Sequence, residues 1–126
     1  MQINIPNGPF AKYKGSEDNL QKSVAKYLDA KGLVWCHAPN GGTRNIVEAT
    51  KLKAMGTKSG VPDCLIFTRK GGFSGFAIEL KVGYNKPSEN QVQFMQQLEN
   101  QGWLIVVSYS LDHCIALIDW YVSLDK

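Results

Sequence analysis

The sequence predicts a mixed α/β fold in which helices flank a small β-sheet. Stretches with helical periodicity alternate with short apolar stretches typical of strands, in the order α-β-α-β-β-α-β-α. The 126 residues, of which 44% are hydrophobic, suffice for one core without disulfide support. No repeat or low-complexity linker interrupts the chain. We therefore expect an irregular arm at residues 1–15 and a single domain at residues 16–126.

The expected helices are bounded by capping residues and glycines. Ser16 precedes a helical stretch that ends at Gly32, and Ser88 precedes another that ends at Gly102. Between them lies an amphipathic stretch closed by Gly56. We expect helices at residues 16–31, 46–55, 87–100 and 111–124.

The strands are expected at residues 33–37, 64–68, 76–82 and 104–109. The turn-forming residues 69–72 join the second and third strands into a β-hairpin. The last strand is continuously apolar, which is typical of a strand buried on both faces of a sheet.

Composition excludes several classes of protein. No stretch approaches the roughly 18 apolar residues of a membrane helix, and residues 1–15 lack the apolar core of a signal peptide. The three cysteines show no C-x-x-C spacing, so we expect small core cysteines, no zinc knuckle or disulfide framework, and a cytoplasmic location. Lys and Arg number 14 against 11 Asp and Glu, and the net charge of +3 permits a polyanionic partner.

The third expected strand carries a polar pair on one face. Because successive side chains of a strand alternate between faces, Phe76, Ile78 and Leu80 share one face. Glu79 and Lys81 then share the other. A carboxylate and an ammonium on a covered sheet face must pair or have a function. The simpler interpretation is an ion pair on a half-exposed hairpin.

The second expected strand begins with another acid. Pro62 fixes the backbone before Asp63, and symmetric pairing about the turn brings Asp63 towards the Lys81 end of its partner strand. Two carboxylates and one lysine then converge. Mg²⁺ binds one or two acids together with water and substrate phosphate. A lysine can orient, or help to deprotonate, water that attacks phosphorus.

These residues resemble a known signature. Val61-Pro62-Asp63, fifteen residues and then Glu79-Leu80-Lys81 are similar to the PD-(D/E)xK nuclease motif. Further matches resemble the VRR-NUC (virus-type replication-repair nuclease) branch of that superfamily: Ser16-Glu17-x-x-Leu20-Gln21, Asn40-Gly41-Gly42, Lys53-x-x-Gly56-x-Lys58-x-Gly60-Val61-Pro62-Asp63 and Ser88-x-x-Gln91. The resemblance covers nearly the whole domain and implies a restriction-endonuclease-like fold.

The resemblance also implies an acid on the first helix. At about 100° per residue, Gln21, Val24 and Leu28 lie within about 40° of Glu17, whereas Asp18 lies on the flank. An acid in an inward-facing stripe needs a metal or a partner, so Glu17 is the preferred acid and Asp18 the alternative. The other interpretation is that Glu17 only complements the N-terminal helix dipole.

Gln91 has two interpretations. It lies on the same side of its helix as Phe94, Met95 and Leu98, so it is expected to point at the sheet, which suits a catalytic role. It also stands three residues after Ser88, in the S-x-x-Q spacing of a capping box, which is a structural role.

A basic segment leads into Asp63. Its cations are Arg44, Lys51, Lys53 and Lys58, opposed only by Glu48. Such a run is often a solvated surface, but here it flanks the proposed site and suits phosphate contacts. We expect DNA binding by Arg44, Lys53, Lys58 and Gln21. His37 and His113 lack metal-ligand spacing and are expected to be packing residues.

The resemblance implies a Mg²⁺- or Mn²⁺-dependent endodeoxyribonuclease that cleaves branched DNA, such as a four-way junction or a flap, in DNA repair. The implied metal ligands are Asp63, Glu79, the backbone carbonyl of Leu80, and Glu17. Lys81 would serve the attacking water, and Gln91 is the further catalytic candidate. No organic cofactor and no membrane partner are expected. The alternative is a non-catalytic or partner-directed DNA-binding module with a nuclease-like fold.

The last helix predicts a homodimer. One of its apolar stripes, through Leu111, Ile115, Ile118 and Val122, can cover the sheet. His113, Leu117, Trp120 and Leu124 form a second stripe. We expect a two-fold interface formed by Leu117, Trp120 and Leu124. The alternative is that the N-terminal arm, with Phe10 and Tyr13, covers the second stripe.

Overall fold

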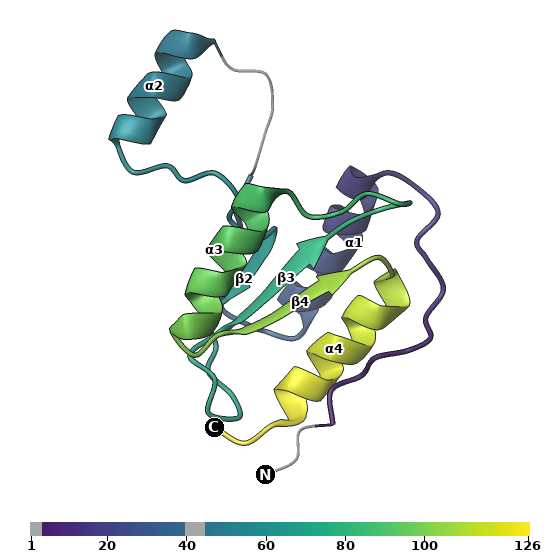
Figure 1. Cartoon of the computed structure of the whole chain (residues 1–126). Helices are drawn as coiled ribbons and strands as arrows, with labels where there is room; N and C mark the ends of the chain where they lie inside the picture. Colours follow the sequence, from purple (N-terminus) through teal and green to yellow (C-terminus); the bar gives the residue numbers. More distant parts are fainter. Residues whose placement is uncertain (1–3, 40–44) are drawn as a thin grey trace.

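The computed structural model describes residues 4–39 and 45–126, and its element order confirms the predicted α-β-α-β-β-α-β-α succession (Figure 1). In chain order the elements are α1 (Glu17–Ala30), β1 (Trp35–His37), α2 (Ile46–Ala54), β2 (Cys64–Ile66), β3 (Phe76–Leu80), α3 (Glu89–Asn100), β4 (Leu104–Ser108) and α4 (Leu111–Ser123). Each strand is shorter than predicted, because pairing ends before the apolar stretch does.

The helix starts are capped as the sequence predicts. The hydroxyl of Ser16 accepts a hydrogen bond from the amide of Asn19 at 3.1 Å, which satisfies a free N–H group at the start of α1. Ser88 and Gln91 form a reciprocal capping box at the start of α3. Gly32 follows α1 with a φ of 70°, a conformation that other residues rarely adopt. No helix in the described part of the chain is long and apolar enough to cross a membrane.

The four strands form one sheet in the order β1-β2-β3-β4. The β2–β3 pair is antiparallel, which confirms the predicted hairpin, and β4 joins β3 in parallel after the crossover through α3. β3 is therefore central and buried along its whole length. β4 lies at the edge of the sheet and is mostly half-buried, so the prediction of a strand buried on both faces is wrong. Cys36 lies on the other edge strand and is exposed, so it is not a core residue.

Two helices, α1 and α4, pack together on one face of the sheet (Figure 1). They form a core with β2 and β3, whose members are Leu20, Val24, Leu28, Cys64, Ile66, Phe76, Ile78, Leu80, Cys114, Leu117, Ile118 and Tyr121. Glu79 alternates with the core residues of β3 and therefore lies on the opposite face, as the strand period predicts. On that side of the sheet α3 packs against β4 (Figure 1).

The helix α2 stands away from the rest of the domain (Figure 1). None of its residues is buried, and Ile46 and Val47 are 84% and 80% exposed. Leu52 alone on this helix is partly buried. The predicted helix is therefore present, but its apolar positions do not pack on the sheet.

The N-terminal arm runs along α4 and the end of β4. Ile5 packs against the core, and the ring of Phe10 stacks on that of His113 with centroids 4.9 Å apart. The Nε2 atom of His113 lies 3.2 Å from the carbonyl oxygen of Pro6. The amide of Tyr13 donates to the carbonyl of Tyr109 at 2.8 Å. His113 is thus a packing residue, as predicted.

The apolar stripe predicted to form a dimer interface is not a free surface. Leu117 is completely buried in the core, and Trp120 and Leu124 are partly buried against it. Leu124 also packs on the hairpin turn at Gly71. The prediction that Leu117 belongs to a dimer interface is therefore wrong, because this position of α4 is buried in the core. The arm covers His113, which confirms part of the alternative. An interface through Trp120 and Leu124, which are only partly buried, stays a prediction.

Candidate active site

The segment before β2 is held tightly against the start of α3. Gly60 has a φ of 84° and is buried, and a Cβ atom there would lie 2.5 Å from the carbonyl oxygen of Asn90. Pro62 is also buried. Only glycine allows both this conformation and this close approach. This packing therefore fixes the path of the backbone into β2, and with it the position of Asp63.

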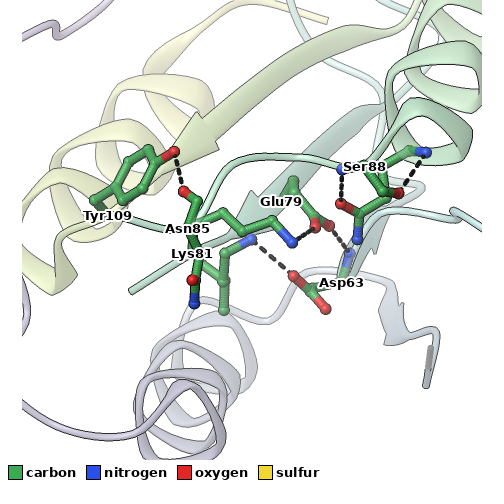
Figure 2. Close-up of polar contacts among 8 residues, drawn as sticks. Asp63, Glu79, Lys81, Asn85, Ser88 and Tyr109 are labelled. Carbon is green, nitrogen blue, oxygen red and sulfur yellow. Dashed lines mark hydrogen bonds and ion pairs between the residues drawn. The ribbon is translucent and has the colours of Figure 1, made fainter. Parts of the chain in front are cut away.

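Asp63 and Glu79 face each other across the hairpin. The β2–β3 pairing matches Cys64 with Ile78, so the residues next to them, Asp63 and Glu79, lie side by side (Figure 2). The amide of Asp63 donates to Oε1 of Glu79 at 3.2 Å. The Oδ2 atom of Asp63 accepts a hydrogen bond from the amide of Leu80 at 2.7 Å. Each carboxylate is thus anchored by the backbone of the opposite strand.

Lys81 completes this group. Its Nζ atom lies 3.1 Å from Oε2 of Glu79, whose side chain is only 1% exposed (Figure 2). This contact is an ion pair without hydrogen-bond geometry, because Oε2 accepts no hydrogen bond within the described residues. The structure therefore brings Asp63, Glu79 and Lys81 together and leaves one buried carboxylate oxygen incompletely satisfied.

The surroundings of Glu79 disfavour its ionised form. Burial raises the pKa of Glu79 to about 7, the negative charge of Asp63 acts in the same direction, and the Lys81 ammonium opposes both. A carboxylate of this kind is uncommon outside functional sites. A cation placed between the two acids would favour their ionised forms.

The three polar residues considered on α1 differ in their placement. Glu17 is partly buried, and its pKa is raised first by that burial and then by the charge of Asp63, with Lys81 opposing. Glu17 is therefore within electrostatic range of the site. Asp18 is exposed. Gln21 turns towards the core, where its Nε2 lies 3.4 Å from Sγ of Cys64, the residue after Asp63.

Gln91 is engaged in its capping role. Its Oε1 accepts a hydrogen bond from the amide of Ser88 at 2.8 Å, and its own amide donates to the Ser88 hydroxyl at 3.2 Å (Figure 2). Of the two interpretations of this residue, the structure contains the capping box. A catalytic role for Gln91 remains a prediction and would require this side chain to serve both functions.

The basic residues border a hollow between α2 and the start of α3. The hollow has a volume of about 560 Å³, and its walls include Lys53, Lys58, Gly60, Ser88 and Gln91. It is therefore next to the segment that leads to Asp63, although Asp63, Glu79 and Lys81 do not line it. Arg44, the other predicted DNA-binding cation, and the turn 40–42 lie outside the described residues.

His37 has a role that the sequence did not indicate. Its Nδ1 atom lies 2.7 Å from the backbone carbonyl oxygen of Asp63, and the amide of Ala38 donates to the same oxygen at 3.2 Å. His37 is exposed, so it is not the packing residue predicted. It braces the backbone of Asp63 from β1. A lone histidine gives no sequence signal for this contact, which depends on how β1 pairs with β2.

Asp63 and Glu79 together are suitable ligands for a hard divalent cation. Within residues 4–39 and 45–126, no group of three or more His, Cys, Asp or Glu side chains is arranged to hold a metal ion. Mg²⁺ commonly takes only one or two carboxylates and keeps water and substrate phosphate as its other ligands. Asp63 and Glu79 match this requirement, and the Glu79 Oε2 atom, which is paired with Lys81 but accepts no hydrogen bond, can serve as a ligand atom for such a cation. The carbonyl of Leu80 and the Glu17 carboxylate remain predicted further ligands.

Comparisons with known proteins agree on a fold. No protein-family model and no curated protein sequence matches the chain. A solved structure described as a "VRR_NUC domain protein" has a TM-score of 0.75 and 28% sequence identity, and covers 90% of this chain and 94% of its own. A second, described as a "VRR_NUC domain", has a TM-score of 0.56 and 22% identity over 83% of this chain and 96% of its own, and supports the fold alone.

Proposed function

We propose that this chain, which has the restriction-endonuclease-like fold of solved VRR-NUC domains, is a Mg²⁺- or Mn²⁺-dependent endodeoxyribonuclease acting on branched DNA. The observation that supports this most is the group of Asp63, Glu79 and Lys81 at the end of the hairpin. The nearly buried Glu79 carboxylate has an oxygen without a hydrogen bond, beside a second acid and a lysine. A hairpin that served only structure would gain nothing from burying these charges.

Asp63 and Glu79 would hold the cation, with the carbonyl of Leu80 and the Glu17 carboxylate as additional ligands. A divalent cation bound there supplies Lewis-acid polarisation of the phosphate and makes water a better nucleophile at neutral pH. The protein's own contribution is the fixed position of the two carboxylates, because each is hydrogen-bonded to the opposite strand. Preorganised charge of this kind needs no rearrangement during the reaction.

Lys81 would act on water and on phosphate charge. Its ammonium is mostly shielded from solvent, with 11% of the side chain exposed, and lies beside Glu79. From there it can orient the attacking water and stabilise negative charge that develops on the phosphate oxygens. Glu79 keeps Lys81 in place through the ion pair, so the two residues are expected to act as a unit.

The nucleic acid would reach the site over the basic segment. Lys53 and Lys58 line the hollow beside α3, and Arg44 belongs to the same stretch of chain. Lysine and arginine contacts to phosphates position a strand without reading its sequence. Selectivity would therefore rest on the shape of the DNA. A homodimer with two identical sites suits symmetric cleavage of a four-way junction, and its interface cannot include Leu117, which is fully buried.

The test is a cleavage assay with purified protein, Mn²⁺ or Mg²⁺, and labelled single-stranded, duplex, flap and four-way DNAs. We expect cleavage of the branched substrates and a loss of at least about a hundredfold in Glu79→Gln, Asp63→Asn and Lys81→Met. Glu99→Gln, an exposed acid on α3, is the control and should cleave at the wild-type rate.

Two results would contradict the proposal. Cleavage by Glu79→Gln at the wild-type rate would exclude this catalytic group. DNA binding by the wild type without cleavage of any substrate, with either metal, would instead support the alternative of a non-catalytic DNA-binding module. Light scattering on the same samples measures whether the active species is a homodimer.

A further inference from the structure

The loop that follows β3 exposes an aromatic ring beside the proposed active site. It starts directly after Lys81 and carries Tyr84, whose side chain is 92% exposed. Exposure of a single aromatic residue is common on protein surfaces and needs no explanation by itself. The surroundings of this tyrosine make it different.

The loop is fixed rather than loose. The hydroxyl of Tyr109 donates to the carbonyl of Asn85 at 2.6 Å (Figure 2), and the amide of Asn85 donates to the carbonyl of Val82 at 3.3 Å. The Nζ atom of Lys12, on the N-terminal arm, donates to the carbonyl of Gly83 at 3.4 Å. Two contacts from outside the loop and one within it therefore hold its backbone in place.

Two lysines, Lys12 and Lys86, lie near the Tyr84 ring. The Nζ atom of Lys12 lies 4.3 Å from the ring centroid of Tyr84 and 5.9 Å from that of Tyr109. A shallow hollow of about 210 Å³ is lined by Lys12, Gly83, Tyr84, Lys86 and Tyr109, and no carboxylate lines it. We refer to these five residues as the Tyr84 hollow. Two cations and two aromatic rings in one hollow are the combination that single-stranded nucleic acids bind.

The Tyr84 hollow is connected to the proposed catalytic group by the pairing of β3 with β4. The amide of Lys81 donates to the carbonyl of Ser108 at 3.0 Å, and Tyr109 is the following residue. Lys81 directly follows β3 and Tyr109 directly follows β4, so the two residues lie at the same end of this strand pair. A strand with a phosphate at the site could place a neighbouring nucleotide in the hollow.

We propose that the Tyr84 hollow binds an unpaired base of the substrate, which stacks on the Tyr84 ring, with its phosphates held by Lys12 and Lys86. This inference rests on the proposed function and identifies its substrate class as DNA with a single-stranded flank. A paired base inside a duplex cannot reach the ring, because both of its faces are already stacked. A fully paired substrate would then contact the two lysines only through its phosphates.

The inference is tested by fluorescence anisotropy in Ca²⁺, with the DNA checked to be intact afterwards. The probes are a blunt duplex and the same duplex with a single-stranded tail that contains 2-aminopurine. Tyr84→Ala is expected to weaken binding of the tailed probe about tenfold and of the blunt probe less than about twofold. Tyr84→Phe keeps the ring and should match the wild type. Phe67→Ala, at the other end of the hairpin, is the aromatic control and should leave both affinities unchanged.

The 2-aminopurine signal adds a direct readout of stacking. Its fluorescence should be quenched on binding to the wild type and to Tyr84→Phe, and not on binding to Tyr84→Ala. Equal losses of affinity for both probes would overturn the inference, since they would mean phosphate contacts alone. An unchanged Tyr84→Ala affinity would overturn it as well. If the wild type cleaves DNA in these cases, only the inference fails; if it neither binds nor cleaves DNA, the proposed function fails too.

Discussion

Two regions close together in the sequence differ sharply in how they are packed. At the end of the hairpin Glu79 is buried and Asp63 partly buried, both are hydrogen-bonded, and the backbone is braced by β1 and α3. The helix α2, only nine residues before Asp63, has no buried residue and stands away from the sheet. A site that must hold two carboxylates together needs surrounding structure to oppose their repulsion. Lysines that contact phosphates need only a long side chain and a positive charge. The proposed chemistry and the proposed binding surface are therefore built with very different rigidity.

Substitution of Gly60, in the tightly packed region, should have the largest effect on the free energy of unfolding. Gly60→Ala places a Cβ atom 2.5 Å from the carbonyl oxygen of Asn90 at a positive φ, so the backbone must move. We expect a loss of about 2–4 kcal/mol in the free energy of unfolding. Gly56→Ala is the matched control, because Gly56 also has a positive φ but a Cβ atom there would meet nothing within 4 Å. It should lose about 1 kcal/mol. Equal losses in urea denaturation would contradict the comparison.

Binding of the proposed divalent cation should have the next largest effect on stability, and only through the hairpin end. An ion that binds only the folded state stabilises it by about 2.7 kcal/mol at a hundredfold excess over its Kd. Mn²⁺ should therefore raise the Tm of the wild type, and a chelator should reverse the rise. The double variant Asp63→Ala/Glu79→Ala should show no rise. An equal rise in both proteins in calorimetry would mean that the ion binds elsewhere.

The third effect is a dependence of stability on pH. The pKa of Glu79 is raised by burial and by Asp63 to about 7, so the folded state holds this proton more tightly than the unfolded state does. The associated stability is complete below about pH 4.5 and is lost as the pH rises through about 7. Without metal, we expect the protein to be about 1–3 kcal/mol less stable at pH 8 than at pH 5 from this group.

Glu79→Gln removes that dependence and keeps the shape of the side chain. Denaturant titrations at several pH values should give a flatter profile for this variant than for the wild type. Glu48→Gln, an exposed acid on α2, should leave the profile unchanged. An identical slope in the wild type and Glu79→Gln would show that Glu79 is not the titrating group.

The smallest effect on stability is expected in the basic segment. Lys53→Ala and Lys58→Ala should change the free energy of unfolding by less than about 0.5 kcal/mol, because both side chains are exposed. Together with Arg44→Ala they should weaken DNA binding equally across sequences and flatten its salt dependence. Affinity measurements at several salt concentrations test this. A strong sequence preference in the wild type would instead favour base-specific recognition.

The parts of the fold with local signals could be predicted from the sequence. Ser16 and Ser88 mark helix starts because their side chains cap free amides, and the hairpin pairs its strands about a local turn. The convergence of Asp63, Glu79 and Lys81 follows from that pairing and from strand alternation. The proposed catalytic group can therefore be predicted from the sequence, since every contact within it depends on one hairpin.

Features that depend on distant contacts could not be predicted. Helical periodicity indicates two apolar stripes on the last helix but not which one faces the sheet, and Leu117 is buried. The brace between His37 and the Asp63 carbonyl depends on the register of β1. The exposure of Ile46 and Val47 depends on which elements α2 packs against, and no local pattern indicates this.

The hydrogen bond from the amide of Leu80 to Oδ2 of Asp63 has a spectroscopic consequence. The proton in this bond lies in a central, buried strand, so it should exchange with deuterium more slowly than the amides of α2. Its chemical shift depends on the charge of the oxygen that accepts it, because a hydrogen bond to an ionised carboxylate is shorter and stronger than one to a neutral group. A cation that binds Asp63 draws charge from its carboxylate and therefore changes the resonance of Leu80. One backbone proton can be followed through a titration and records the occupancy of the site without a label.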